Sequence, residues 1–481
     1  MLGLALSGGG FRAALYHVGV LAQLARLGVL RHVAVLSACS GGSPIGALYC
    51  LRLKQLADRQ RDLTPAGYCE LVRTIETEFL VAVQRNLRVR AYLNPWKSLA
   101  GANRMAELFD EHVFGRAIPL RDLRSPGLPR LIINAANLKT GHNWRFEAAG
   151  MAEPARDDPV FLEIDRNRRY STPLPADVTL GVACVASAGF PGVVPPLALG
   201  PALLADGGIY DDRAIDPLLD VGCTRFIISD ASPQLPDDEH PRTSTFYTLL
   251  RGSRIWFDRL RQLQLLRLLE SQDRPVAYPH LRKGLGSPIE NPEDFGVDRT
   301  VQERLMRVRI DLDSFSDVEA FSLMLDGYLI TGRELRKVRG FEDLIAASPI
   351  ETPFRFLQMQ ARMRAPDPAY LRQLDVAAKL FFKVFRLSAA PWLAAAVLLA
   401  VIWPWLLLLL AVAAAAGAVG ALGVVWRPAE VPARLLARRL LAALASPVVA
   451  LHLAVFDPWF LRLGKVASAA GPASRTAAAN R

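Results

Sequence analysis

The stretch Val33–Gly46 reads VAVLSACSGGSPIG and decides the fold. It opens with a short apolar run, Val33–Leu36, which is typical of a buried strand. The run breaks into small residues and then passes Pro44 into a segment with helical character, Ile45–Leu56. A strand, a tight turn and a helix in this order predict an α/β protein with a parallel sheet.

Ser40 lies in the turn, with Ala38 two residues before it and Gly42 two residues after it. This spacing is similar to a nucleophile elbow, G-x-S-x-G, in which a sharp turn between strand and helix exposes a serine. The helix that follows would direct its first N–H groups at negative charge developing on the target of the serine. The stretch fits equally an ordinary turn into a helix, with Ser43 as N-cap and Pro44 as the first helical residue.

A glycine-rich loop, Ser7–Ala13, follows the apolar run Leu2–Leu6 and precedes apolar residues at helical spacing. It is not a P-loop, because no Gly-Lys-Ser/Thr follows. A dinucleotide site needs an acidic residue about 20 positions further on, whereas the first Asp or Glu of the chain is Asp58. Because the loop lies one strand from Ser40, we favour an oxyanion hole formed by the N–H groups of Gly8, Gly9 and Gly10.

Asp206 is the second candidate for chemistry. It ends the apolar run Pro201–Ala205, and Gly207 and Gly208 let the chain turn and leave space around the carboxylate. A carboxylate in this position could accept the proton of Ser40 directly, as a general base. An Asp-Gly pair also forms ordinary turns. Three other acidic residues follow closely enough to compete for the role: Asp211, Asp212 and Asp230.

A histidine could complete a Ser-His-Asp triad instead. The seven histidines are His17, His32, His112, His142, His240, His280 and His452. In the hydrolase order the histidine follows the acid in a loop at a strand end, where only His240 and His280 are candidates. Both lie in polar loops without a supporting motif, so we favour a solvated role for them.

Further apolar runs predict additional strands, and the region 62–125 is mostly helical in pattern. We expect these strands at Leu131–Ala136, Val178–Ala186, Pro201–Ala205 and Phe226–Ser229. The last three are separated by segments rich in Pro, Gly and Asp, which favour loops. The chain therefore predicts one large sheet covered by helices on both faces.

The net charge of +11 and the pI of about 9.7 indicate an anionic partner, either nucleic acid or anionic lipid. No nucleic-acid module and no interleaving of aromatic and basic residues is visible, so we predict no nucleic-acid partner. The five cysteines are scattered and odd in number, which predicts buried thiols rather than disulfides or a zinc site. The opening MLGLALSGGG has no basic region typical of a signal peptide, so we expect the catalytic part on the cytoplasmic side.

Together these motifs resemble the patatin-like phospholipase family of serine acyl hydrolases. The resemblance is strong from Met1 to about Ser232 and continues weakly to about Lys337. Several motifs that agree in order and spacing are more specific than any single motif. The matching segments are Gly8-Gly9-Gly10-Phe11-Arg12, Ala38-Cys39-Ser40-Gly41-Gly42, Ala186-Ser187-Ala188-Gly189-Phe190-Pro191 with Pro195-Pro196, Asp206-Gly207-Gly208 and Leu325-Asp326-Gly327-Tyr328.

The resemblance implies a three-layer α/β/α fold and hydrolysis of lipid acyl esters by a Ser-Asp dyad, without a metal or another cofactor. Ser40 would be the nucleophile and Asp206 the base, while the glycine loop would hold the oxyanion. Arg12 matches a basic position beside the hole and would hold the loop or meet a lipid phosphate. The supporting turn residues would be Gly42, Gly207 and Gly208.

The chain departs from the family pattern at three positions. Ala38 replaces the first glycine of the elbow, Ala13 replaces the last glycine of the loop, and Ser7 stands where many members have Asp. Alanine is the smallest replacement and fits wherever φ stays negative. We therefore expect activity to be retained.

The C-terminal part has the pattern of a membrane anchor. No charged residue occurs from Leu387 to Trp426, and a spanning helix needs about 20 residues, so one long or two short crossings fit. Four tryptophans in this stretch suit the membrane interfaces, and Pro404 could mark a hairpin tip. Basic residues flank both ends, which favours a hairpin with both ends on the cytoplasmic side. A helical hairpin buried in a soluble core is the alternative.

We therefore divide the chain into a patatin-like catalytic domain (1–345), a helical linker (346–386), a membrane-spanning region (387–426), basic amphipathic interfacial helices (427–465) and a disordered tail (466–481). Pro432–Ala445 is a basic amphipathic helix suited to an anionic surface. Arg251–Leu269 has a similar pattern and would either cover the sheet or touch the membrane.

These patterns favour a membrane-associated lipid acyl hydrolase whose partners are a membrane lipid substrate and an anionic membrane surface. An acyltransferase that passes the acyl group to another lipid would use the same dyad. A catalytically weak scaffold that binds lipid or a protein is the alternative left open by Ala38 and Ala13.

Overall fold

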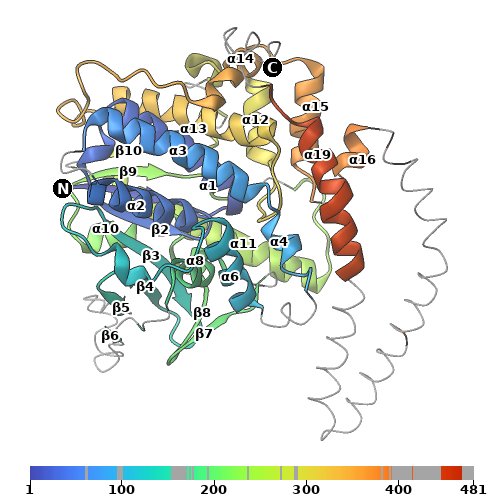
Figure 1. The fold of residues 1–481 in the computed structure, drawn as a ribbon, viewed down its shortest axis with the longest axis horizontal. Coiled ribbons are helices and arrows are strands. Elements are labelled where there is room, and N and C mark those ends of the chain that lie inside the picture. Colours follow the sequence, from blue (N-terminus) through green and yellow to red (C-terminus); the bar gives the residue numbers. More distant parts are fainter. Residues whose placement is uncertain are drawn as a thin grey trace, which may run out of the picture.

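A ten-stranded mixed sheet forms the centre of the protein (Figure 1). The structure is a computed structural model. It describes residues 1–59, 63–94, 101–152, 171–172, 175, 178–191, 194–233, 235, 238–270, 274–285, 291–380, 383–388, 390, 392, 414 and 446–467.

The sheet has the strand order β10-β9-β1-β2-β3-β4-β5-β6, and β8 pairs with β3 and with β7. From β10 to β3 the neighbours are parallel, and every other pair is antiparallel. The strands are β1 (Leu2–Leu6), β2 (Val33–Cys39), β3 (Arg130–Asn137), β4 (Asn143–Glu147), β5 (Gly150–Ala152), β6 (Ser171–Thr172), β7 (Leu197–Leu199), β8 (Ala202–Asp206), β9 (Arg225–Ser229) and β10 (Val276–Ala277). The mixed α/β class is confirmed.

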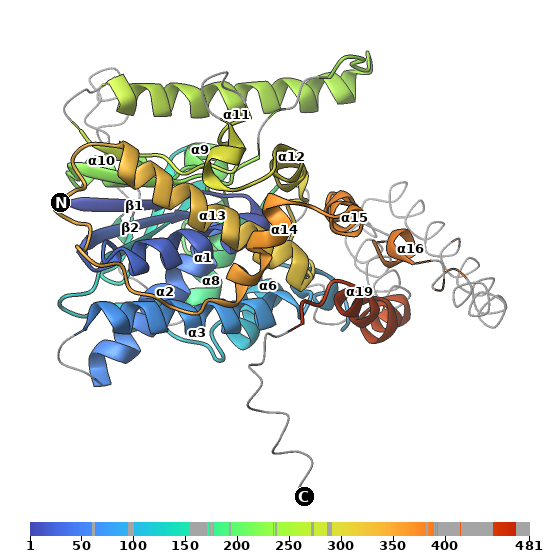
Figure 2. The same cartoon turned by 90° about the horizontal axis from the view of Figure 1, so that it is seen from above.

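Helices cover both faces of the sheet (Figure 2). On one face lie α1 (Gly10–Arg26), α2 (Gly42–Arg59), α3 (Pro65–Val83) and α13 (Asp317–Lys337), and on the other lie α9 (Gly208–Asp211), α10 (Asp216–Asp220), α11 (Thr245–Glu270) and α12 (Arg299–Arg307). The other α-helices among the described residues are α4 (Leu87–Arg90), α6 (Ala102–His112), α8 (Leu180–Ala188), α14 (Gln360–Arg364), α15 (Pro368–Ala377), α16 (Lys383–Leu387) and α19 (Asp457–Leu463).

Two hydrophobic cores lie on the two faces of the sheet. Successive strand residues alternate between them, because neighbouring side chains of a strand point to opposite faces. In β1, Leu4 and Leu6 belong to the larger core and Ala5 to the smaller one. Helix α1 is buried almost all round between the sheet, α3 and α13. Its polar residues Arg12, His17 and Gln23 are buried too, as expected of an internal helix.

The expected strand at Val178–Ala186 is wrong: most of this segment forms α8. Thr179 caps the helix, since its side chain accepts a hydrogen bond from Val182 N at 3.2 Å. Nearly every residue of α8 is buried, so the sequence has no amphipathic period. A short apolar run without such a period does not distinguish a buried helix from a strand.

The segment 346–386, expected to be a helical linker, contains the 3₁₀ helix Arg355–Met359 with α14, α15 and α16. Its side chains enter the larger core, where Phe356, Met359 and Tyr370 are fully buried. Phe460 of α19 is also buried. These contacts join the segment closely to the domain built around the central sheet.

No helix among the described residues is both long and apolar enough to cross a membrane. The expected membrane region 387–426 lies outside the described residues, apart from 387, 388, 390, 392 and 414. The amphipathic segment expected at Pro432–Ala445 and most of the tail expected at 466–481 also lie outside them.

Candidate active site

Ser40 occupies a strained turn between β2 and α2. Its φ of 46° lies in the left-handed region, which costs a residue with a side chain roughly 1–2 kcal/mol. The turn brings backbones close together, since a Cβ added at Gly42 would lie 2.4 Å from the carbonyl oxygen of Leu6. Strain of this kind persists only where surrounding structure enforces it. The conformation is that of a nucleophile elbow.

The hydroxyl of Ser40 contacts Asp206 directly. Ser40 Oγ donates a hydrogen bond to Asp206 Oδ2 at 2.8 Å, without an intervening imidazole. The other carboxylate oxygen of Asp206 accepts from Gly208 N at 2.7 Å, at the turn that follows β8. Both side chains are buried, so the contact is largely shielded from solvent. The structure thus brings the two predicted catalytic residues together.

The register of β3 explains why two residues so far apart in the sequence meet. β2 runs parallel to β3 as far as the pair Cys39–Asn134. The next position of β3, Ala135, pairs with Asp206 of the antiparallel strand β8. Because β4 occupies the other edge of β3 at these positions, β2 and β8 meet end to end along one edge. Ser40 and Asp206 stand at this junction.

Ser187 connects the elbow to the Asp206 turn. Its hydroxyl accepts a hydrogen bond from Ser40 N at 2.8 Å and lies 2.7 Å from Ser43 Oγ. Its carbonyl oxygen accepts from Gly207 N at 2.9 Å. No role is predicted for Ser187 from the sequence, although this serine lies near the end of an apolar segment. It is a positioning residue for both halves of the site.

Burial raises the pKa of Asp206 to about 7. The hydrogen bonds from Ser40 and Gly208 lower the pKa, whereas the nearby negative charge of Asp212 raises it, and burial is the largest effect. A carboxylate with a pKa near neutrality is a far better proton acceptor than an ordinary aspartate. The site therefore has the electrostatics of a general base.

The glycine loop lies against the elbow, where a Cβ added at Gly41 would lie 2.5 Å from Gly10 N. Gly8 N donates to the carbonyl oxygen of Asp212 at 2.8 Å, so the expected contribution of this N–H to an oxyanion hole is not seen. Among the described residues, the N–H groups of Gly9 and Gly10 have no acceptor. Both glycines have positive φ, of 128° and 60°. They are the loop donors that remain for an oxyanion.

Arg12 ties the glycine loop to the rest of the domain. Its guanidinium donates to the carbonyl oxygens of Met306, Val308 and Ala231. Burial lowers the pKa of Arg12 to about 10. Because the group is buried and donates to three carbonyls, the structure fits the loop-holding role better than contact with a lipid phosphate.

The competing acidic residues are committed elsewhere. Asp211 Oδ2 accepts from Asp216 N at 2.9 Å, and Asp212 Oδ2 accepts from Arg261 Nη1 at 2.9 Å. Asp230 Oδ2 accepts from Arg213 Nε at 2.7 Å. Asp206, by contrast, is the carboxylate that accepts a hydrogen bond from Ser40.

The histidines have other surroundings. His17 is buried with Nδ1 2.6 Å from Ser229 Oγ and Nε2 3.0 Å from the carbonyl oxygen of Ser7, and burial lowers its pKa to about 4. His280 stacks on Tyr278 with ring centroids 4.7 Å apart. His240 is exposed in a loop.

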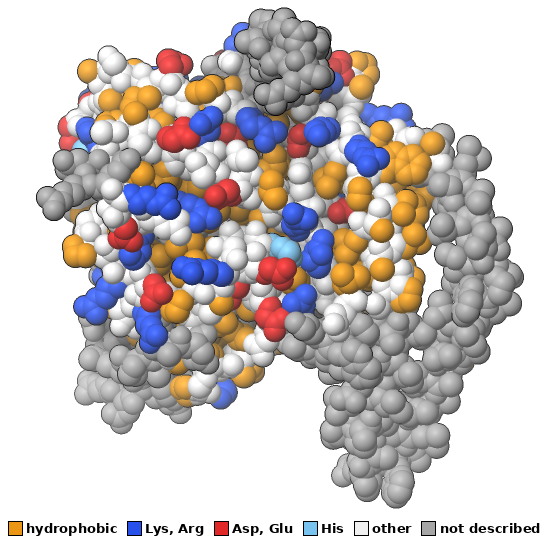
Figure 3. All heavy atoms as spheres, viewed as in Figure 1, with side chains coloured by type: hydrophobic (Ala, Val, Ile, Leu, Met, Phe, Trp, Pro, Cys, Tyr) orange, Lys and Arg blue, Asp and Glu red, His pale blue; other side chains and the backbone are white. Residues whose placement is uncertain are grey.

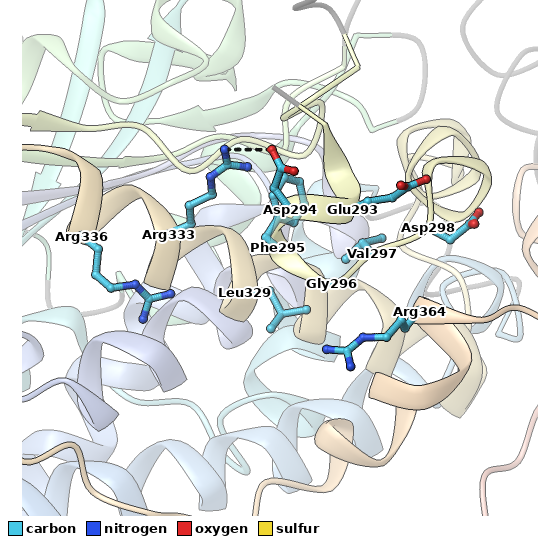
Figure 4. A pocket seen from close by; sticks show the side chains of 10 residues that line it. All are labelled: Glu293, Asp294, Phe295, Gly296, Val297, Asp298, Leu329, Arg333, Arg336 and Arg364. Carbon is cyan, nitrogen blue, oxygen red and sulfur yellow. Dashed lines mark hydrogen bonds and ion pairs between the residues drawn. The ribbon is translucent and has the colours of Figure 1, made fainter. Parts of the chain in front are cut away.

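A separate pocket of about 580 Å³ lies beside α13 (Figure 4). One of its arginines, Arg333, is paired with an acid, since Arg333 Nη2 lies 3.3 Å from Asp294 Oδ2. The guanidinium of Arg333 also lies 5.4 Å from the centre of the Phe295 ring. Neither Ser40 nor Asp206 lines this pocket. The candidate chemistry and this pocket are therefore distinct.

A strained serine bonded to a buried carboxylate of raised pKa belongs to the class of sites that support nucleophilic catalysis. The family model described as patatin-like phospholipase matches residues 4–219, slightly less than half of the chain. This range contains the glycine loop, the elbow and Asp206, and the match supports lipid acyl hydrolase activity in general.

Among solved structures, human GIVD cytosolic phospholipase A2 is similar at 17% sequence identity and a TM-score of 0.27. The similarity covers 39% of this chain and 28% of the human chain, so it spans less than a third of that protein. A comparison with curated proteins gives no match.

Proposed function

We propose that this protein is a serine lipid acyl hydrolase that acts at a membrane through a Ser40–Asp206 dyad. The observation that carries the proposal is the 2.8 Å hydrogen bond from Ser40 Oγ to the buried Asp206 carboxylate. The family match over residues 4–219 supports the substrate class, a lipid ester. No metal or organic cofactor enters the proposed reaction.

The reaction begins when Asp206 accepts the proton of Ser40 while Ser40 Oγ attacks the ester carbonyl carbon. The carbonyl oxygen becomes an alkoxide, which the N–H groups of Gly9 and Gly10 stabilise. The alcohol part of the lipid then leaves with the proton held by Asp206, and an acyl-serine remains. Asp206 next takes a proton from water, whose oxygen attacks the acyl group, and returns this proton to Ser40 Oγ as the bond between Oγ and the acyl carbon breaks. The products are a fatty acid and free Ser40.

Burial makes the dyad workable without a histidine. An ordinary aspartate, with a pKa of about 3.9, is too weak a base to accept a serine proton efficiently at neutral pH. The raised pKa of Asp206, about 7, reduces this mismatch by about three pKa units. The left-handed backbone of Ser40 keeps its hydroxyl at the open end of the elbow.

The residues on the two sides of the apolar stretch contact one another, which bears on how often the stretch would cross a membrane. Phe385 and Phe456 have ring centroids 5.2 Å apart, and Lys383 Nζ lies 4.2 Å from the centre of the Phe460 ring. A chain that leaves and re-enters at one place crosses a membrane an even number of times, which favours the hairpin expected at 387–426. Basic flanks then favour the cytoplasmic side for the catalytic domain.

Exposed apolar side chains accompany these flanks. Val448 and Val455, just before α19, are exposed. On the face shown in Figure 3, hydrophobic side chains gather along the side of the molecule where α19 lies. An exposed apolar surface of this kind suits contact with lipid better than contact with water.

A fluorophosphonate probe tests the dyad. Wild-type protein in lipid or detergent should be labelled, Ser40→Ala should not, and Asp206→Asn should react about 10²–10⁴-fold more slowly, the usual contribution of a general base. Ser43→Ala is the matched control, because Ser43 lies in the same elbow and should leave labelling largely intact. Labelling that survives Ser40→Ala would contradict the nucleophile assignment. Unlabelled wild-type protein would favour a scaffold.

An internal replacement tests the anchor. A variant in which a Gly-Ser linker replaces 389–445 keeps α16 and α19, whose contacts close the domain. It should leave the membrane fraction yet still react with the probe. Continued membrane association of a well-folded, labelled variant would place the main anchor outside 389–445.

A further inference from the structure

We propose that α11 forms a second membrane contact, an interfacial helix that seats the Ser40 site on an anionic bilayer surface. The inference deepens the proposed function and rests on its membrane action. It concerns a different part of the chain from the C-terminal apolar stretch, and its evidence comes from exposure, spacing and charge of α11.

The first evidence is how little of α11 is buried. Of its 26 residues, only Arg261 and Leu268 are buried. Phe246 and Trp256 are each 72% exposed and Leu249 is 64% exposed. A helix that only covers a sheet buries its apolar side. Figure 2 shows α11 as the outermost element along one side of the molecule, beyond α9, α10 and α12.

Four of the ten exposed apolar residues of α11 form a stripe along one side of the helix. Leu249, Trp256, Leu260 and Leu263 follow one another at steps of seven, four and three residues, which places them on one side of a helix. Leu260 and Leu263 are each 47% exposed. The buried Arg261 and Leu268 lie at the same seven-residue step on a different side. The stripe therefore lies on a solvent-facing side of α11, and further exposed apolar residues flank it.

Charge identifies the surface that fits this stripe. α11 carries five arginines against Asp258 and Glu270. Of the arginines, Arg254, Arg259 and Arg267 are exposed. An apolar stripe with tryptophan and exposed arginines suits the headgroup region of an anionic bilayer. Two copies of α11 side by side would instead bring two helices of the same net positive charge together, which favours lipid over self-association.

Hydrogen bonds connect α11 to the catalytic loop. Arg261 Nη1 donates to Asp212 Oδ2 at 2.9 Å, and the carbonyl oxygen of Asp212 accepts from Gly8 N at 2.8 Å. Arg213 Nη1 also donates to the carbonyl oxygen of Arg261. A bilayer contact along α11 would thus hold the glycine loop, and the dyad beside it, at a fixed distance from the lipid headgroups.

Environment-sensitive labels test the contact in the full chain. The five native cysteines are all buried, so a new surface cysteine can be labelled selectively with a nitrobenzoxadiazole dye. The test positions are Leu249→Cys and Trp256→Cys, and Gln262→Cys is the matched control on another exposed side of α11. Each protein is reconstituted in phosphatidylcholine vesicles with or without phosphatidylglycerol.

With phosphatidylglycerol, the labels at 249 and 256 should shift to the blue, brighten severalfold and be quenched by nitroxide lipids, while the label at 262 stays unchanged. Several outcomes would overturn the proposal. These are no response at 249 and 256, an equal response at all three positions, a response that ignores phosphatidylglycerol, or a lipid-independent response that rises with protein concentration. The last outcome would identify a second copy as the occupant.

A charge insertion separates this inference from the proposed function. The double variant Leu249→Glu/Trp256→Glu should hydrolyse vesicle-embedded phospholipid severalfold more slowly than wild type, while Gln262→Glu does not. Fluorophosphonate labelling of Ser40 in detergent should be unchanged in both. Normal vesicle hydrolysis by the double variant would overturn the role of α11. Loss of labelling in wild type itself would instead overturn the dyad and leave the dye result standing.

Discussion

Asp206 and Asp230 are two buried aspartates at strand ends whose pKa values move in opposite directions. Asp206 ends β8 and Asp230 follows β9 directly. Burial disfavours the charged form of both. The pKa of Asp206 rises to about 7, whereas the charge of Arg213 and hydrogen bonds hold the pKa of Asp230 well below its usual range. The same side chain in similar burial is a base at one site and a permanent anion at the other.

The partners explain the difference. Asp230 accepts from the guanidinium of Arg213 and from the hydroxyl of Tyr278. Asp206 accepts from two neutral donors, Ser40 Oγ and Gly208 N. Hydrogen bonds from neutral groups offset only part of the desolvation of a carboxylate, while a buried cation more than offsets it. Asp206 is therefore suited to act as a base because its hydrogen-bond donors are neutral rather than cationic.

The largest expected effect is on the ion pair between Asp230 and Arg213. Asp230→Asn should lower the free energy of unfolding by about 3–5 kcal/mol, because it leaves the buried guanidinium of Arg213 without its counterion. Urea denaturation measures the change. The double variant Asp230→Asn/Arg213→Met should recover part of the loss. A single variant as stable as wild type would show that the pair does not set the charge of Asp230.

The second prediction concerns the pH dependence of the Ser40–Asp206 site. A base must be deprotonated, so the rate of fluorophosphonate labelling should be half-maximal near pH 7 and fall about tenfold per pH unit below it. The rate should be level above about pH 8. Asp230 stays ionised throughout this range, because Arg213 lowers its pKa, and does not contribute to the profile. A rate independent of pH between 5 and 8 would contradict the raised pKa of Asp206.

The third prediction is that Asp206→Asn stabilises the protein at alkaline pH. The pKa of Asp206 is higher in the folded than in the unfolded chain, so ionisation above about pH 7 costs folding free energy, and the cost fades as the pH falls through 7 toward 4. An uncharged amide avoids this cost. Thermal unfolding should show the variant more stable by on the order of 4 kcal/mol at pH 8, with the gap closing near pH 4. A gap that is constant with pH would contradict this account.

The local parts of the site could be predicted from the sequence. The strand before the glycine loop begins and ends as expected, at Leu2 and Leu6. The elbow at Ser40 follows a strand and opens a helix. Such features depend on neighbours in the chain, whose side-chain period and turn residues are visible directly. Asp206 could be proposed because two glycines follow it.

The long-range parts could not be predicted. The end-to-end meeting of β2 and β8 depends on the register of β3, where Asn134 and Ala135 pair with different strands. Strand order of this kind is decided by tertiary packing and leaves no local pattern. Helix α8 was missed because its burial removes the amphipathic period. The position of Ser187 within this helix could therefore not be predicted. The bond from Gly8 N to the carbonyl oxygen of Asp212 joins distant parts of the chain and, like the strand order, leaves no local pattern.

The smallest expected effect concerns Ser187, a neutral residue that positions Asp206 and Ser40. Ser187→Ala removes the acceptor for Ser40 N, and losing one buried hydrogen bond should cost about 1 kcal/mol of stability. The elbow should also hold the Ser40–Asp206 bond less firmly, so the labelling rate should fall severalfold while its half-maximal pH stays near 7.

Ser43→Ala is the matched control for Ser187→Ala, because it removes the other contact of the Ser187 hydroxyl and leaves the bond from Ser40 N in place. If the two variants slow labelling equally, Ser187 does not act through the backbone of Ser40. If Ser187→Ala moves the half-maximal pH, its hydroxyl contributes to the charge balance of Asp206. The contrast with Asp230 would then involve neutral neighbours as well as the missing cation.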